Sequence, residues 1–244
     1  KFLITLPRPW LALIVAIPYF IIVVSMGFVR QGLAIAIFLY AITFIKKAQF
    51  KSYIIWIFIA STFHLSVLFF LPLILLQFLQ KNILSSIFGL ILILIIFYFN
   101  YDLVIDKAID YFNFEMQSSG SFLRSLMNLL PAIIFVFFSK RFRVSKDEKL
   151  FWFQLSLISI IFLILLIYFP SYTIIDRLGY YLIGLQIFVF SYLPGVFGIY
   201  NKKNIFWVLS INIYYFSVLL IWQIFAYHNY AWIPYNSYLF NLNW

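Results

Sequence analysis

Long apolar runs separated by short polar stretches dominate the chain, and they predict a bundle of transmembrane helices. Several runs lack any charged residue and approach or exceed the ~18 residues expected of a spanning helix. The predicted spans are residues 9–28, 31–45, 83–99, 122–138, 150–169, 178–198 and 205–226. We therefore expect an all-α polytopic bundle with about seven full crossings.

Residues 52–79 break this regularity, because they are too long for one simple crossing and short for two. His64 and Ser66 lie near the middle, and basic residues flank both ends. The charges favour a hairpin or re-entrant segment, and a single crossing is the alternative. Irregular backbone at membrane depth is tolerated mainly where it lines a cavity, so a hairpin would bring His64 toward such a cavity.

Residues 102–116 predict an amphipathic helix at the outer surface. Asp102, Asp106 and Asp110 recur every four residues, with apolar residues between them. This row is typical of a solvated helix face, and divalent-ion binding is the weaker alternative. The only two histidines, His64 and His228, are far apart and have no zinc-site spacing.

Smaller features predict the local shape of the spans. Pro18 predicts a kink in residues 9–28, and Gly32 predicts a close contact of the next helix with a neighbour. We expect residues 170–176 to form a short loop that carries Asp176. The pair Pro194-Gly195 predicts a late break in residues 178–198.

Composition agrees with a membrane protein. The chain is 66% hydrophobic and 10% charged, against about 25% charged residues in an average soluble domain. Its net charge of +10 is explained by the positive-inside rule, so no nucleic-acid partner is needed. Absence of cysteine excludes disulfides and thiolate metal sites. The chain reads as one transmembrane domain, residues 1–244, and its start at Lys1 leads us to expect the C-terminal part of a longer protein.

Charge placement orients the bundle. With residues 140–149 in the cytoplasm and a hairpin at 52–79, all but four of the 17 basic residues lie inside. The exceptions are Arg30, Lys107, Arg124 and Arg177. Lys107 lies among acidic residues, which explain it. The other three are all arginines beside apolar segments on the outer side.

Three arginines beside apolar segments on the outer side indicate an anionic ligand. Guanidinium groups match phosphate oxygens bidentately, so Arg30, Arg124 and Arg177 together would suit a lipid-linked diphosphate at the interface. In glycosyl transfer the diphosphate leaves, and nearby cations stabilise its growing charge. His64 and Asp176 are the candidate bases for the acceptor hydroxyl. As alternatives, each arginine is a snorkelling anchor, His64 bonds a neighbouring helix, and Asp176 pairs with a cation.

Short motifs resemble those of the EpsG family of membrane proteins. Arg30-Gln31-Gly32-Leu33-Ala34 resembles the family's Arg-Gln-x-x-Ala motif, and Ala60-Ser61-Thr62-Phe63-His64-Leu65-Ser66 resembles its Ala-Ser-x-x-His-x-Ser stretch. Ser119-Gly120 with Arg124, and Arg177-Leu178-Gly179-Tyr180-Tyr181, resemble later family features. The family is similar to the Wzy-type polymerases of bacterial polysaccharide synthesis.

This resemblance implies a glycosyltransferase that joins oligosaccharide repeat units carried on undecaprenyl diphosphate. It would act in the bacterial cytoplasmic membrane with its site facing outward, beside the pathway's chain-length regulator and flippase proteins. Carried over residue by residue, it implies a site of Arg30, His64, Arg124 and Arg177. Gln31 and Tyr181 would support substrate binding. No metal or nucleotide cofactor is implied.

Two other functions use the same chemistry. A glycan ligase would grip the same lipid-linked donor but transfer to a different acceptor. A flippase or transporter of lipid-linked oligosaccharide would also need a cationic cavity, but with charged residues accessible from both sides of the lipid bilayer.

Overall fold

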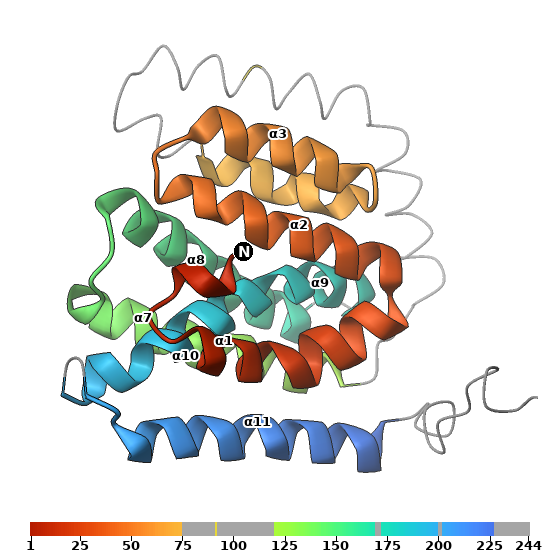
Figure 1. The fold of residues 1–244 in the computed structure, drawn as a ribbon. Helices are drawn as coiled ribbons and strands as arrows, with labels where there is room; N and C mark the ends of the chain where they lie inside the picture. The colour runs from red at the N-terminus through yellow and green to blue at the C-terminus, as the bar shows by residue number, and fades with distance from the viewer. Residues whose placement is uncertain (75–90, 92–119, 169–171, 200–201, 227–244) are drawn as a thin grey trace, which may run out of the picture.

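The computed structural model describes residues 1–74, 91, 120–168, 172–199 and 202–226, and within these ranges it is helical throughout, with no strand (Figure 1). In chain order the elements are η1 (Leu3–Thr5), α1 (Pro9–Ala16), η2 (Ile17–Ser25), α2 (Val29–Ile45), α3 (Phe50–Ser61), η3 (Leu65–Ile74), α7 (Ser121–Phe138), η4 (Ser139–Arg141), α8 (Lys146–Tyr168), α9 (Tyr172–Gly179), η5 (Tyr180–Leu182), α10 (Ile183–Phe197) and α11 (Ile205–Phe225). The predicted all-α class is confirmed.

Among the described residues, four helical stretches are long and apolar enough to cross a membrane: Ser121–Arg141, Lys146–Tyr168, Thr173–Phe197 and Ile205–Phe225. The helices nearer the N-terminus are apolar but shorter. The number of crossings therefore stays a prediction. The predicted helices at 83–99 and 102–116 and the tail with His228 lie outside the described residues.

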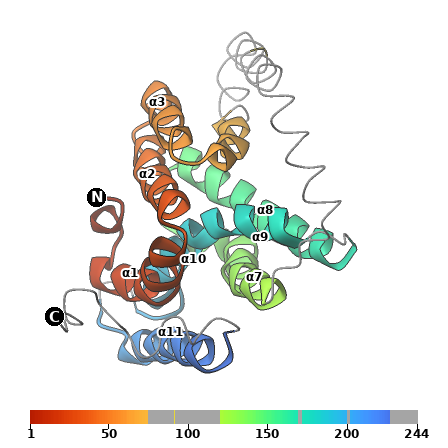
Figure 2. The same cartoon turned by 90° about the vertical axis from the view of Figure 1, so that its right-hand side faces the viewer.

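The helices pack around α10, whose side chains are almost all buried. Helix α10 contacts α1, α7 and α11, while α2 packs on α3 and α7 packs on α8. Figure 2, viewed from one end of the bundle, shows α11 along one side, beside α1 and α10. Only Ile211 and Tyr215 of α11 are buried, so most of this apolar helix faces outward.

The segment predicted as a hairpin turns at its middle. Helix α3 ends at Ser61, residues 62–64 form a turn, and the 3-10 helix η3 runs back alongside α3 (Figure 1). The buried Tyr53 hydroxyl donates to the carbonyl oxygen of Phe70 at 2.9 Å, which joins the two arms. His64 therefore lies in the turn. The remainder of the predicted segment, residues 75–79, is outside the described part of the chain.

The kink predicted at Pro18 takes the form of a π-helix. Pro18 lacks the N–H that an α-helix would use, and residues Ile17–Ser25 adopt the wider π winding. The chain then turns sharply into α2. A Cβ added to Gly32 would lie 2.6 Å from the Cα of Ser25, so the predicted close approach at Gly32 is present.

Two local predictions were wrong. Residues Tyr172 to Asp176 are helical rather than a loop, because α9 continues through the 3-10 turn η5 into α10. Pro194 does not end its helix either, because α10 continues to Phe197. Leu193, Pro194 and Val196 are buried, and this packing outweighs the low helix propensity of proline. The helix ends instead where the Asn204 side chain donates to the carbonyl oxygens of Pro194 and Ile199 at 2.6 and 2.7 Å.

Lysine-rich connections gather at one end of the bundle. In Figure 1 the α2–α3 turn, the α7–α8 connection and the junction of α10 with α11 all lie at the left. Arg8 joins this end, since its guanidinium donates to the carbonyl oxygen of Lys202 at 2.7 Å. The η2–α2 junction, the α3–η3 turn and the start of α7 lie at the opposite end (Figure 1). We call this the arginine end, because the helix starts that carry Arg30 and Arg124 are there.

Candidate functional site

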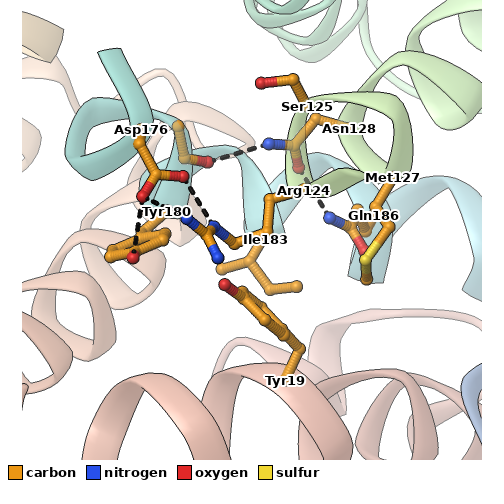
Figure 3. Close-up of a pocket in the computed structure, with 10 residues that line it drawn as sticks. Tyr19, Arg124, Ser125, Met127, Asn128, Asp176, Tyr180, Ile183 and Gln186 are labelled. Atoms are coloured by element: carbon orange, nitrogen blue, oxygen red, sulfur yellow. Dashed lines mark hydrogen bonds and ion pairs between the residues drawn. The ribbon is translucent and has the colours of Figure 1, made fainter. Parts of the chain in front are cut away.

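A bidentate ion pair lies at the arginine end, between α7 and α9. Arg124 donates from Nε to Oδ1 of Asp176 at 2.7 Å, and from Nη2 to Oδ2 at 2.7 Å. The Tyr180 hydroxyl also donates to Oδ2 at 3.1 Å, and the guanidinium lies over the Tyr180 ring (Figure 3). Asp176 is only 3% exposed, so this carboxylate is desolvated and held by its partners.

A buried chain of amides continues from this pair. Asn128 donates to the carbonyl oxygen of Gly179 at 3.0 Å and accepts from Gln186 at 2.6 Å (Figure 3). The Tyr215 hydroxyl of α11 donates to Gln186 at 2.7 Å. A 3-10 turn inside a helix leaves carbonyls open to such donors, and Gly179 immediately precedes η5. Four helical elements are thereby tied together behind the ion pair.

Sequence reasoning did not single out Asn128, Gln186 or Tyr215. Asn128 and Gln186 could have been noticed because each places a carboxamide inside an apolar span. Burying a carboxamide there costs free energy unless the group is hydrogen-bonded. The sequence shows such residues, but their partners lie on other helices.

A small pocket opens beside these groups. Its cavity volume is about 10 Å³, which admits about one water molecule and no sugar ring. It is lined by Tyr19, Arg124, Ser125, Met127, Asn128, Asp176, Gly179, Tyr180, Ile183 and Gln186 (Figure 3). In this conformation the pocket is a packed junction with polar walls.

A second cluster is built around the α3–η3 turn. Nδ1 of His64 lies 2.6 Å from Oγ of Ser66, and Ser66 donates to the Tyr181 hydroxyl at 3.0 Å. Tyr181 is fully buried, with its ring against Phe38 of α2 and Phe70 of η3. Its predicted substrate contact stays a prediction, since the structure places it in the core with its hydroxyl on Ser66.

Arginines on two other elements surround the imidazole electrostatically. Partial burial, followed by the positive charges of Arg177 and Arg30, lowers the pKa of His64, which lies outside the four spanning helices. The imidazole is therefore neutral near pH 7 and able to accept a proton. Gln31, next to Arg30, is buried and donates to the backbone carbonyl of Arg177 at 2.7 Å, which ties α2 to α9.

The predicted site residues thus fall into two neighbouring groups. The first group holds His64 and the two arginines whose positive charges lower its pKa, Arg30 and Arg177, with Gln31 and Tyr181 linking their elements. Arg124 belongs to the other group, paired with Asp176. Its carboxylate has both oxygens occupied by Arg124 and Tyr180, so Asp176 is a poorer candidate base than His64 in this conformation.

Apolar spanning helices and a polar, arginine-bearing end define an integral membrane protein with a buried ionisable cluster. Comparison with protein families then identifies it more closely: the chain belongs to the EpsG family, which it matches over residues 3–237. Members of this family are Wzy-type polysaccharide polymerases and exopolysaccharide biosynthesis proteins. Comparisons with curated proteins and with solved structures found no match.

Proposed function

We propose that the chain is a membrane glycosyltransferase that polymerises oligosaccharide units carried on undecaprenyl diphosphate. It would act at the outer face of the bacterial cytoplasmic membrane. Family membership supports a role in polysaccharide biosynthesis. The observation that carries the finer proposal is the 2.7 Å hydrogen bond from Gln31 to the backbone carbonyl of Arg177, which holds Arg30 and Arg177 on adjoining elements at the end of the bundle opposite the lysine-rich connections, the end that also holds the turn with His64.

In the proposed reaction, the diphosphate of the donor lies against Arg30 and Arg177. Their planar donors stabilise the negative charge that develops as the glycosidic carbon–oxygen bond to diphosphate breaks. Neutral His64 takes the proton of the acceptor hydroxyl as that oxygen bonds to the sugar. Undecaprenyl diphosphate is the leaving group, and the proton resides on the imidazole.

Arg124 has a different place in this scheme. Its two bonds to Asp176 occupy the side of the guanidinium, Nε and Nη2, that would bind a phosphate side-on. Arg124 therefore braces α7 against α9, the helix that carries Arg177, and it binds the diphosphate side-on only if Asp176 exchanges partners.

The test is an Arg→Lys series in a strain that depends on this protein for polymer. Arg30→Lys and Arg177→Lys should insert normally but lose most of the polymer ladder, because an ammonium does not replace a bidentate fork. Arg143→Lys, in the lysine-rich connection between α7 and α8, is the matched control and should keep full chain length. Full ladders in both test variants would show that these arginines are anchors.

Sidedness and product separate the competing functions. The chain has no cysteine, so single cysteines beside Arg30 and His64 can be labelled cleanly from either side of the membrane. Labelling from outside at both positions is expected, and labelling only from the cytoplasm would contradict the outer site. A ladder of lengths indicates a polymerase, one transferred glycan a ligase, and repeat units trapped on the inner leaflet of a mutant a flippase.

A further inference from the structure

Two hydrogen bonds around the α3–η3 turn link His64 to Ser66 and Ser66 to Tyr181. A serine hydroxyl has one proton, and Ser66 donates it to the Tyr181 hydroxyl at 3.0 Å. With Ser66 as the donor to Tyr181, the 2.6 Å contact between Ser66 Oγ and His64 Nδ1 is a bond that Nδ1–H donates. In the neutral ring this leaves Nε2 as the nitrogen with a free lone pair.

Tyr181, at the far end of this series of hydrogen bonds, is held rigidly. Tyr181 is fully buried in η5, with its ring centroid 5.6 Å from that of Phe38 and 5.0 Å from that of Phe70. Bulky packing on two helices fixes the phenol, so the hydroxyl of Ser66 has one defined acceptor. His64 itself is only half-buried in a turn, where its own backbone would not hold the ring in one orientation.

We propose that Ser66 and Tyr181 are positioning residues that hold His64 in the tautomer with Nδ1 protonated and Nε2 ready to accept the proton of the acceptor hydroxyl. This inference rests on the proposed function, in which His64 is the general base. It reassigns Tyr181 from substrate binding to the support of the imidazole. It also gives a role to Ser66, at the end of the stretch that contains His64.

The first test removes and restores the serine hydroxyl. Ser66→Ala should lower kcat for polymerisation about 10-fold to 100-fold, part of the ~10²–10⁴-fold that a general base contributes. The KM for the lipid-linked donor should stay within about twofold, because the arginines are untouched. Ser66→Thr keeps a hydroxyl and should recover most of kcat. Ser210→Ala is the control and should match the wild type, because the Ser210 hydroxyl donates to the Phe206 carbonyl oxygen of its own helix at 2.9 Å.

Tyr181→Phe tests the direction of the bonds. Without the phenol oxygen, the Ser66 hydroxyl is free to donate to Nδ1, which would leave Nε2 protonated and unable to act as a base. We expect a loss of kcat of about 10-fold or more, although the ring and its packing remain. A Tyr181→Phe variant with wild-type kcat would overturn the proposed tautomer.

A double variant separates positioning from structural support. If Ser66 acts only through His64, Ser66→Ala should cost nothing further in a His64→Ala background, measured with radiolabelled repeat units so that residual transfer is quantified. An additive loss would mean that Ser66 supports the fold, and the inference would be wrong. Equal losses in the Ala and Thr single variants would also overturn it.

The same experiments distinguish this inference from the proposed function. If His64→Ala polymerises normally, His64 is not the base and the proposed mechanism fails. If His64→Ala loses activity while Ser66→Ala and Tyr181→Phe do not, the mechanism stands and only the positioning role is wrong. Membrane levels of each variant, read by immunoblot, show whether a loss reflects missing protein.

Discussion

Asp176→Asn is the most informative perturbation of the buried ion pair, because it keeps the shape of the side chain and removes its charge. Two charge-assisted bonds from Arg124 at 2.7 Å are lost or weakened, and such bonds contribute ~1.5–3 kcal/mol each. Arg124 is 19% exposed and Asp176 3%, so solvent replaces little of the loss. Removing one partner of a buried ion pair typically costs ~3–5 kcal/mol of stability, which agrees with the summed contributions of the two hydrogen bonds.

Stability can be measured by transferring purified protein into mixed micelles with increasing SDS and following the fluorescence of its seven tryptophans. Glu148→Gln is the matched control. Glu148 forms a capping box with Ser145 at the start of α8, accepting from the Ser145 N–H at 3.3 Å. Glutamine preserves that motif, so we expect a change under about 1 kcal/mol.

The double variant Arg124→Gln with Asp176→Asn tests whether the cost arises from the uncompensated charge. Two neutral amides at these positions should recover at least ~2 kcal/mol relative to the sum of the single variants. Two results would refute the reasoning. One is an Asp176→Asn variant as stable as the Glu148→Gln control, and the other is a strictly additive double variant.

Four further outcomes are expected. As the pH falls, polymerisation should be lost with a midpoint below the ordinary pKa of histidine, since the pKa of His64 is lowered by burial and by the charges of Arg177 and Arg30. Arg177→Gln removes one cause of that lowering, so the fall should begin at higher pH, and an unmoved profile would contradict the electrostatic contact. Gly32→Ala should destabilise by ~1–3 kcal/mol in the micelle assay, because its Cβ would meet the backbone of Ser25 at 2.6 Å. Gln186→Leu should cost ~1–3 kcal/mol by leaving its two hydrogen-bond partners unsatisfied, and a stability equal to the wild type would show that water replaces the amide.

Helix positions were largely predictable from residue order. Apolar runs gave α7, α8 and α11 within a few residues, since an apolar stretch in a membrane must satisfy its backbone internally. The break near His64 was predictable from length and charge. Asp176 was wrongly predicted to lie in a loop. A short polar stretch has the same sequence pattern whether it forms a connection or a short helix packed against its neighbours.

Site membership was only partly predictable. Arg30, Arg124 and Arg177, the arginines that do not fit the positive-inside rule, were recognisable in the sequence as isolated cations beside apolar runs. Their partners were not, because Arg124 and Asp176 are 52 positions apart and Ser66 and Tyr181 are 115 positions apart. No local pattern encodes which faces of two distant helices meet.

The amino-acid sequence alone therefore determined an all-helical membrane bundle, the separation of Arg30 and Arg124 from the lysine-rich connections, and the family resemblance. These follow from hydrophobic burial and charge sorting, which act on each segment separately. Tertiary structure decided that Arg124 pairs with Asp176, that Gln31 beside Arg30 bonds the backbone of Arg177, and that Ser66 contacts both His64 and Tyr181. Those pairings depend on how α2, η3, α7 and α9 pack, because a hydrogen bond needs its two atoms within about 3 Å.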